Sequence, residues 1–208
     1  MSNMNSEVEN IKEQIISIVD GLLSANELLI EALSSCNIEQ FQNAKSYMKN
    51  ISKKTSDIDN NIIKVLALYS PEAKDLREVV SYFKITNELN RACSSSRSFI
   101  KGFSEICTTI DKDMITKYII PMQKSTTKSI KSVKQMFDTT CDDDINELYN
   151  ETVIEENKTD DLYELIENSQ TNHTMLRILR KCAKIADRAM GIASLLLYAQ
   201  KGGEIHQV

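Results

Sequence analysis

Apolar residues along the first third of the chain recur at alternating spacings of three and four, which is the seam of a bundle helix. One such stretch covers residues 8–32 without interruption, and a second covers residues 41–65 with a polar interruption at Thr55. Asn37 followed by Gln40 resembles a capping box at the start of the second stretch. The pattern predicts a long first helix and a second helix that returns antiparallel to it.

Ser70-Pro71 predicts the start of a third helix, because Ser caps free amides and proline loses no hydrogen bond at the first helical position. This helix is expected to run from Pro71 to about Cys107. Three further helices are expected over residues 113–138, 142–168 and 172–201.

Individual residues in the second half indicate where its helices begin and end. Three aspartates at residues 142–144 favour a helix start through the macrodipole. Pro121 is too deep for a helix that starts at Asp113, so it either kinks that helix or marks its true start. Gly202-Gly203 is expected to end the last helix.

The seam of the last helix repeats the seam of the third at a spacing of 93 residues, from Tyr82 and Met175 to Phe103 and Leu196. This repetition indicates a duplication. The sequence therefore predicts an all-α fold of six long helices in two tandem antiparallel three-helix bundles. The two repeats are residues 1–108 and 109–208, which could pack as one elongated unit.

Composition excludes several classes of function. The 208 residues include 5 Gly, 2 Pro and no Trp, with a formal charge of −5 and no basic tail, so nucleic acid is not expected as a partner. The longest nearly apolar run, residues 189–199, is shorter than the ~20 residues that span a bilayer, and the start lacks signal-peptide features. We expect a cytoplasmic protein that reaches a membrane only through a partner.

Five scattered cysteines without a CxxC pair indicate a reducing compartment, and we expect their side chains to be buried or half-buried rather than ligands. The two histidines are His173 and His206. The residues three before them are Gln170 and Gly203, so no Glu-x-x-His motif is present. The isolated glycines form no phosphate-binding loop. We therefore expect no enzyme, no catalytic residue and no cofactor.

Two segments of the chain carry a recognisable pattern of residues. The first is Ser-Pro-Glu-Ala-Lys-Asp-Leu-Arg at residues 70–77, followed by Phe-Lys-Ile-Thr-Asn-Glu-Leu-Asn-Arg at residues 83–91. The second is the run at residues 179–193, followed by Tyr198 and Gly-Glu-Ile at residues 203–205. Both segments resemble the PhoU family of phosphate-signalling regulators. The matches lie 93 residues apart in six helices of suitable length, so the resemblance covers almost the whole chain.

The resemblance implies a possible metal site, because family members can bind metal clusters through a Glu and an Asp four residues apart. The corresponding positions are Asn90 and Ser94 in the first repeat, and Ala183 and Asp187 in the second. A neutral amide, a hydroxyl and a methyl group cannot neutralise a metal cluster. We therefore expect the metal site to be absent or very weak, with Asp187 as the one retained carboxylate.

Other motif positions are candidates for partner binding. Arg91 and Lys184 keep the basic residue that directly follows the first motif position of each repeat, Asn90 and Ala183. Glu88 is a candidate replacement for a lost carboxylate ligand. Asp75 and Arg77 match the family segment, with a contact at the helix start as the simpler role. Two further groups are expected to be solvated carboxylates on helix faces. These are Glu167 and the set Glu155, Glu156, Asp160 and Asp161.

The resemblance implies a non-enzymatic regulator of phosphate uptake or phosphate-dependent signalling that acts by protein–protein binding. Its implied partners are a phosphate transporter component, a sensor histidine kinase, or both. Two alternatives stay open, an accessory protein of a phosphate permease and a metal-binding helical bundle. A homodimer is also compatible with the resemblance.

Overall fold

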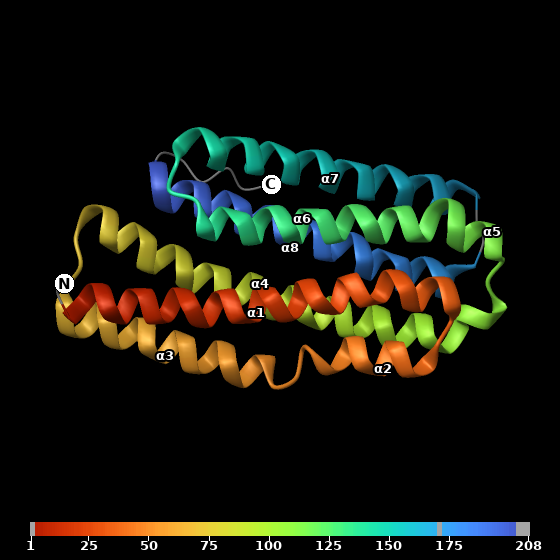
Figure 1. Ribbon diagram of the computed structural model, residues 1–208, viewed down its shortest axis with the longest axis horizontal. Helices are drawn as coiled ribbons and strands as arrows, with labels where there is room; N and C mark the ends of the chain where they lie inside the picture. The colour runs from red at the N-terminus through yellow and green to blue at the C-terminus, as the bar shows by residue number, and fades with distance from the viewer. Residues whose placement is uncertain (1–2, 170–171, 203–208) are drawn as a thin grey trace.

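The chain forms long helices that lie side by side in one elongated bundle, shown in the computed structural model of Figure 1. Residues 3–169 and 172–202 are described by the structure. The first half contains α1 (Asn3–Ser35), α2 (Ile38–Ser46), α3 (Ile51–Tyr69), α4 (Ala73–Ile106) and a 3₁₀ turn, η1 (Cys107–Thr109). The second half contains α5 (Lys112–Met114), a π-helical segment η2 (Ile115–Ile119), α6 (Ile120–Asp138), α7 (Asp142–Ser169) and α8 (His173–Lys201).

This arrangement confirms the predicted all-α class and the six helical rods, counting α2 with α3 and α5 with η2 and α6 as single rods within the described residues. The helix pair in most extensive contact is α4 with α8, and α1 packs on α6, so both contacts join the two halves. Gly102 marks the close approach, because a Cβ there would lie 2.8 Å from Ile178 Cγ1. One apolar core continues through both halves.

The second rod is broken, which the sequence pattern did not indicate. It divides into α2 and α3 at residues 47–50, where Asn50 adopts a left-handed conformation with φ of 57°. Asn tolerates this conformation better than most residues. Met48 and Ile51 are both buried on either side of Asn50, so the apolar spacing continues across the break and conceals it. Gly21 on α1 makes room for the turn, because a Cβ there would lie 2.8 Å from the Tyr47 carbonyl oxygen.

Two predicted helix starts differ in detail from the structure. The Asn37 side chain accepts hydrogen bonds from the amides of Glu39 (2.8 Å) and Gln40 (3.3 Å), which confirms the cap, although the Gln40 side chain accepts from Ser35 Oγ instead of returning to Asn37. The third predicted helix, α4, begins at Ala73, two residues after Pro71. Ser70 instead ends α3 in a left-handed conformation, so it does not cap α4.

Pro121 lies at the second position of α6, and Ile120 separates it from the π-helical segment η2. Proline has no amide hydrogen, and its ring clashes with the carbonyl four residues earlier in a regular α-helix. The wider π turn gives that carbonyl room. Pro121 therefore alters the helical winding, and the rod itself begins nine residues earlier, at Lys112.

A buried polar group joins α1 to α6 and α8. Asn26 and Gln123 are both fully buried, and Gln123 Nε2 donates to Asn26 Oδ1 at 2.8 Å. Asn26 Nδ2 in turn donates to the Leu22 carbonyl at 2.7 Å, and the Cys182 thiol donates to Gln123 Oε1 at 3.3 Å. Paired polar groups of this kind specify one relative placement of the helices that carry them.

One pair of cysteines departs from the expectation of scattered thiols in a reducing compartment. Cys36, at the end of α1, and Cys107, at the end of α4, form a disulfide with their Cα atoms 5.8 Å apart. Cys93 and Cys182 are buried as expected, whereas Cys141 is exposed. The pair escaped sequence reasoning because 71 residues separate its members.

None of the helices in the described part of the chain has the length and apolarity needed to cross a membrane. Gly202 follows α8 with φ of 74°, consistent with the expected helix stop. Gln170 and residues 203–208, which include the Gly-Glu-Ile match and His206, lie outside the described residues.

Candidate functional site

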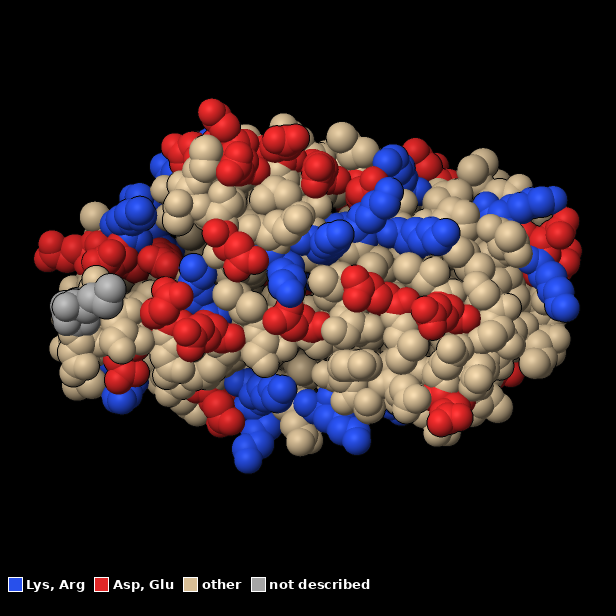
Figure 2. All heavy atoms as spheres, viewed as in Figure 1, with Lys and Arg blue, Asp and Glu red and all other residues tan. Residues whose placement is uncertain are grey.

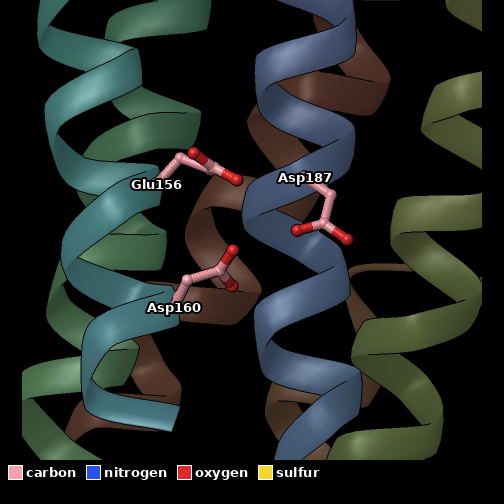
Figure 3. Close-up of side chains that lie close together, drawn as sticks. All are labelled: Glu156, Asp160 and Asp187. Atoms are coloured by element: carbon pink, nitrogen blue, oxygen red, sulfur yellow. The ribbon is translucent and has the colours of Figure 1, made fainter. Parts of the chain in front are cut away.

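Three carboxylates from two helices meet on the surface of the second half, and we call them the acidic triad. Glu156 and Asp160 are four residues apart on α7, so they share one face of that helix. Asp187 on α8 faces them (Figure 3). One oxygen from each carboxylate lies within 4.8 Å of the others, with Glu156 half-buried and the two aspartates exposed.

Local sequence features fix the two helices that carry the triad. Three aspartates in the first turn of α7 complement the positive end of its dipole. The Asn172 side chain caps α8 by accepting from the Met175 amide at 3.1 Å. Apolar side chains on each helix, such as Ile166 and Ile185, pack into the core and leave the triad at the edge of the α7–α8 seam.

Burial and mutual repulsion make the triad carboxylates reluctant to ionise. Desolvation raises the pKa of Glu156, and the charges of Asp160 and Asp187 raise it further. The pKa of Asp160 is raised by desolvation and then by the charge of Asp187. Desolvation also raises the pKa of Asp187, although Arg188 and Arg180 oppose that shift. The triad is thus a concentrated negative charge only partly offset by neighbouring cations.

A cleft of about 220 Å³ opens beside the triad between α7 and α8. Asp160 and Asp187 line it together with Arg180 and Lys184, so its wall carries both signs of charge. The Arg180 guanidinium stacks over the Tyr163 ring, 5.7 Å from the ring centroid. The cleft therefore offers acceptors and donors side by side.

The triad suits one hard divalent cation better than a metal cluster. Three carboxylate oxygens could supply part of the oxygen shell of such an ion, with water completing it. The buried Ala183 puts a methyl group where a fourth carboxylate would be needed. In the first half, Asn90 accepts from Ser52 Oγ at 3.3 Å and Ser94 contacts Arg97, so those positions do not fit a cation.

The candidate residues from the motif comparison lie in different places. Asp187 belongs to the triad and Lys184 lines the adjacent cleft. Glu88 pairs with Arg188 at 3.0 Å and is not one of the three carboxylates that meet in the triad. Arg91 is exposed on α4, outside every ion pair among the described residues.

Asp75 and Arg77 lie near the N-terminal end of α4. Asp75 is in the first turn of that helix, where its charge favours the amide-rich end. Arg77 reaches the end of α8, because a Cβ on Gly202 would lie 3.4 Å from Arg77 Cζ. Arg77 therefore lies where the start of α4 meets the end of α8, at a contact between the two halves.

Sequence reasoning treated Glu156 and Asp160 as solvated carboxylates on a helix face. It also treated Asp187 separately. The missing signal was the pairing of α7 with α8, because Asp187 is 27 residues from Asp160 and no periodicity links them. Knowledge that α7 and α8 pack antiparallel would have indicated that Asp187 lies close to Glu156 and Asp160.

Comparisons with known proteins agree with this architecture. Residues 8–101 match the family model described as the PhoU domain. The chain is 27% identical over 159 residues to the "Phosphate-specific transport system accessory protein PhoU homolog" of Aquifex aeolicus, covering 70% of each protein. It is 24% identical over 223 residues to the corresponding PhoU protein of Serratia marcescens, covering 98% of this chain and 87% of that protein.

Solved structures show the same fold. The PhoU structure from Pseudomonas aeruginosa superposes with a TM-score of 0.83 at 17% identity, covering 97% of this chain and all of that one. The phosphate transport system regulatory protein PhoU from Streptococcus pneumoniae gives a TM-score of 0.78 at 16% identity, covering 99% and 100%. Fold and comparisons together define a PhoU-like six-helix bundle. Over most of its length the chain is similar to PhoU family proteins, at 24–27% sequence identity.

Proposed function

We propose that the chain is a non-enzymatic regulator of phosphate uptake or phosphate-dependent signalling that works by binding other proteins. The observation that carries this proposal is the match over 98% of the chain to a phosphate-specific transport system accessory protein. Within this proposal, residues 1–108 and 109–208 act as two repeats that present different faces to partners. The proposed partners are a component of a phosphate transporter, a sensor histidine kinase, or both.

The architecture supports such a role through rigidity. Long helices held by one continuous core provide a firm docking surface. The buried Asn26–Gln123 hydrogen bond and the Glu88–Arg188 ion pair both join the two halves of the chain, which supports a rigid surface. A regulator of this kind changes its output when an effector alters the relative affinity of two docked states.

Location follows from this proposal. We place the chain in the cytoplasm, held at the membrane by a transporter partner. The surface is rich in charges of both signs, as Figure 2 shows for one face. The motif candidates Asp75, Arg77, Glu88, Arg91, Lys184 and Asp187 are the first positions to substitute when mapping the docking face.

The proposal is tested by a pull-down of the tagged chain from its native host, grown with high and with low phosphate. A tag-only strain is the control. Recovery of a phosphate-transport ATPase or a sensor kinase in a phosphate-dependent manner would support the regulator. Recovery of a permease alone would favour the permease-accessory role, and recovery of none of these under both conditions would refute the proposal.

A further inference from the structure

Two segments of the first half carry basic residues with no acidic residue among them. Residues 40–56 and 89–104 together contain seven Lys and Arg, although the whole chain has a formal charge of −5. None of these seven side chains takes part in an ion pair with any residue that the structure describes. The segments are therefore a concentrated positive region in an acidic protein.

The fold places the two segments against each other. The first contains the α2–α3 break and the second lies in the middle of α4, which contacts both α2 and α3. Ser52 Oγ donates to Asn90 Oδ1 at 3.3 Å, and Arg97 Nη1 donates to the Met48 carbonyl at 3.5 Å. Figure 2 shows Lys and Arg gathered at the lower edge, beneath the α2–α3 break of Figure 1.

Five residues define what we call the basic face: Lys49, Ser52, Lys53, Ser94 and Arg97. Arg97 Nη2 lies 3.4 Å from Ser94 Oγ, so its guanidinium sits beside a hydroxyl. Ser52 and Lys53 are in the first turn of α3, where Asn50 provides no side-chain cap. The amides of Lys53 and Lys54 donate to the Asn50 carbonyl at 3.1 and 3.0 Å, and the positive end of the α3 dipole adds positive potential here.

The basic face corresponds to the acidic triad in the other repeat. At the spacing of 93 residues, Ser94 on α4 matches Asp187 on α8. The neighbouring antiparallel helix contributes Glu156 and Asp160 in the second half. In the first half, the contacts of Ser52 with Asn90 and of Arg97 with Met48 place Lys49 and Lys53 beside α4. The same location thus carries negative charge in one repeat and positive charge in the other.

We propose that the basic face binds a phosphate oxyanion. A guanidinium fork, ammonium groups and hydroxyls are all donors, which matches an anion whose oxygens only accept. Carboxylates flank both segments, at Glu39, Asp57, Glu88 and Glu105. Among the described residues none of these carboxylates forms an ion pair with the seven basic side chains. This inference stands on a different observation from the proposed function, and it is tested without any protein partner.

The shared ligand chemistry has two sources, free orthophosphate and the phosphoryl groups of polyphosphate. The experiment titrates the ¹⁵N-labelled full chain with sodium orthophosphate, with sodium polyphosphate and with sodium chloride at matched ionic strength. The test variant is Lys49→Gln/Lys53→Gln/Arg97→Gln. The matched control is Lys124→Gln/Lys131→Gln/Arg177→Gln, which removes three exposed positive charges elsewhere.

Saturable amide shifts around Ser52 and Ser94 are expected with orthophosphate, and the test variant should bind at least about tenfold more weakly while the control binds as wild type. Saturable binding of polyphosphate alone, lost in the test variant, would support the site and identify a polymeric source. Equal weakening in both variants, or the same shifts with chloride, would overturn the proposal. Arg97→Lys, which retains the charge, provides a folded comparison if the triple variant has a lowered melting temperature.

Discussion

Glu88 on α4 and Arg188 on α8 form an ion pair across the two halves, with 3.0 Å between Oε2 and Nη1. Their side chains are 21% and 33% exposed, so water screens the pair only partly. The Glu88 side chain packs against Gly191, one turn along α8 from Arg188, because a Cβ at Gly191 would be in van der Waals contact with Glu88 Cγ at 3.8 Å. The pair thus ties the two halves together where α4 and α8 meet.

A double-mutant cycle measures this link. We expect Glu88→Gln and Arg188→Gln each to lower the free energy of unfolding by about 1 kcal/mol, with a coupling energy of about 0.5–1 kcal/mol. Urea unfolding of the wild type, the two single variants and the double variant gives the cycle. Strictly additive effects would mean that the two side chains do not interact in solution.

The buried Asn26–Gln123 hydrogen bond should matter more for stability. Asn26→Ala leaves Gln123 Nε2 without its acceptor side chain in a fully buried location. Gln123 Nε2 would keep only its longer contacts, to the Asn26 carbonyl at 3.5 Å and to Thr127 Oγ1 at 3.4 Å. We expect a loss of about 2 kcal/mol in the free energy of unfolding, because a buried donor without its short hydrogen bond bears much of its desolvation cost. Asn60→Ala, at an exposed position of α3, is the control and should change stability by less than about 0.7 kcal/mol. Equal effects at the two positions would contradict the buried arrangement.

Thiol reactivity should follow burial. Desolvation raises the pKa of the Cys93 thiol to about 12 and that of the Cys182 thiol to about 12, so almost no thiolate is present at pH 8. Without reductant, we expect iodoacetamide at pH 8 to alkylate the exposed Cys141 and to leave Cys93 and Cys182 unmodified. Mass spectrometry after native and denaturing alkylation checks this. Native labelling of either buried cysteine at the rate of Cys141 would contradict the packing.

The Cys36–Cys107 disulfide joins positions 71 residues apart, so it restricts the unfolded chain considerably. Chain-entropy arguments give a stabilisation of up to about 4 kcal/mol for a loop of this size. We expect Cys36→Ser/Cys107→Ser to unfold at lower urea concentration than the oxidised wild type. Cys141→Ser is the control and should unfold like wild type. If the double variant matched the oxidised protein, the crosslink would have no role in stability.

Charge repulsion in the acidic triad should cost stability at neutral pH. The pKa of Asp160 is raised in the folded state, so its contribution to stability is present at low pH and is lost as pH rises through that pKa. We therefore expect Asp160→Asn to raise the melting temperature at pH 7.5 in EDTA and to have a smaller effect at pH 4. Asp161→Asn, outside the triad, is the control. A destabilising Asp160→Asn in EDTA would show that the ionised carboxylate makes favourable contacts.

Periodicity predicted the helical rods because most seam positions are core positions. Ile11, Ile15 and Ile18, spaced by four and three, are all 0–1% exposed. The same regularity concealed the α2–α3 break, since Met48 and Ile51 keep the spacing while the backbone turns at Asn50. Local patterns report which face is buried, and they do not report a single residue in a left-handed conformation.

The candidate sites depended on contacts between helices far apart in the sequence. Asp187 was singled out by its motif position, yet its meeting with Glu156 and Asp160 required the packing of α7 against α8. The disulfide partners Cys36 and Cys107 likewise meet only because α1 and α4 end at the same place in the fold. Such meetings are set by tertiary packing, which no single helix pattern specifies.

The central proposal is that this PhoU-like chain regulates phosphate uptake. The most direct test measures uptake of radiolabelled phosphate in the native host after deletion of the gene, with cells grown in high phosphate. The account predicts altered uptake in the deletion strain, mainly in high phosphate, and restoration when the wild-type chain is supplied. Unchanged uptake in both high and low phosphate would contradict it.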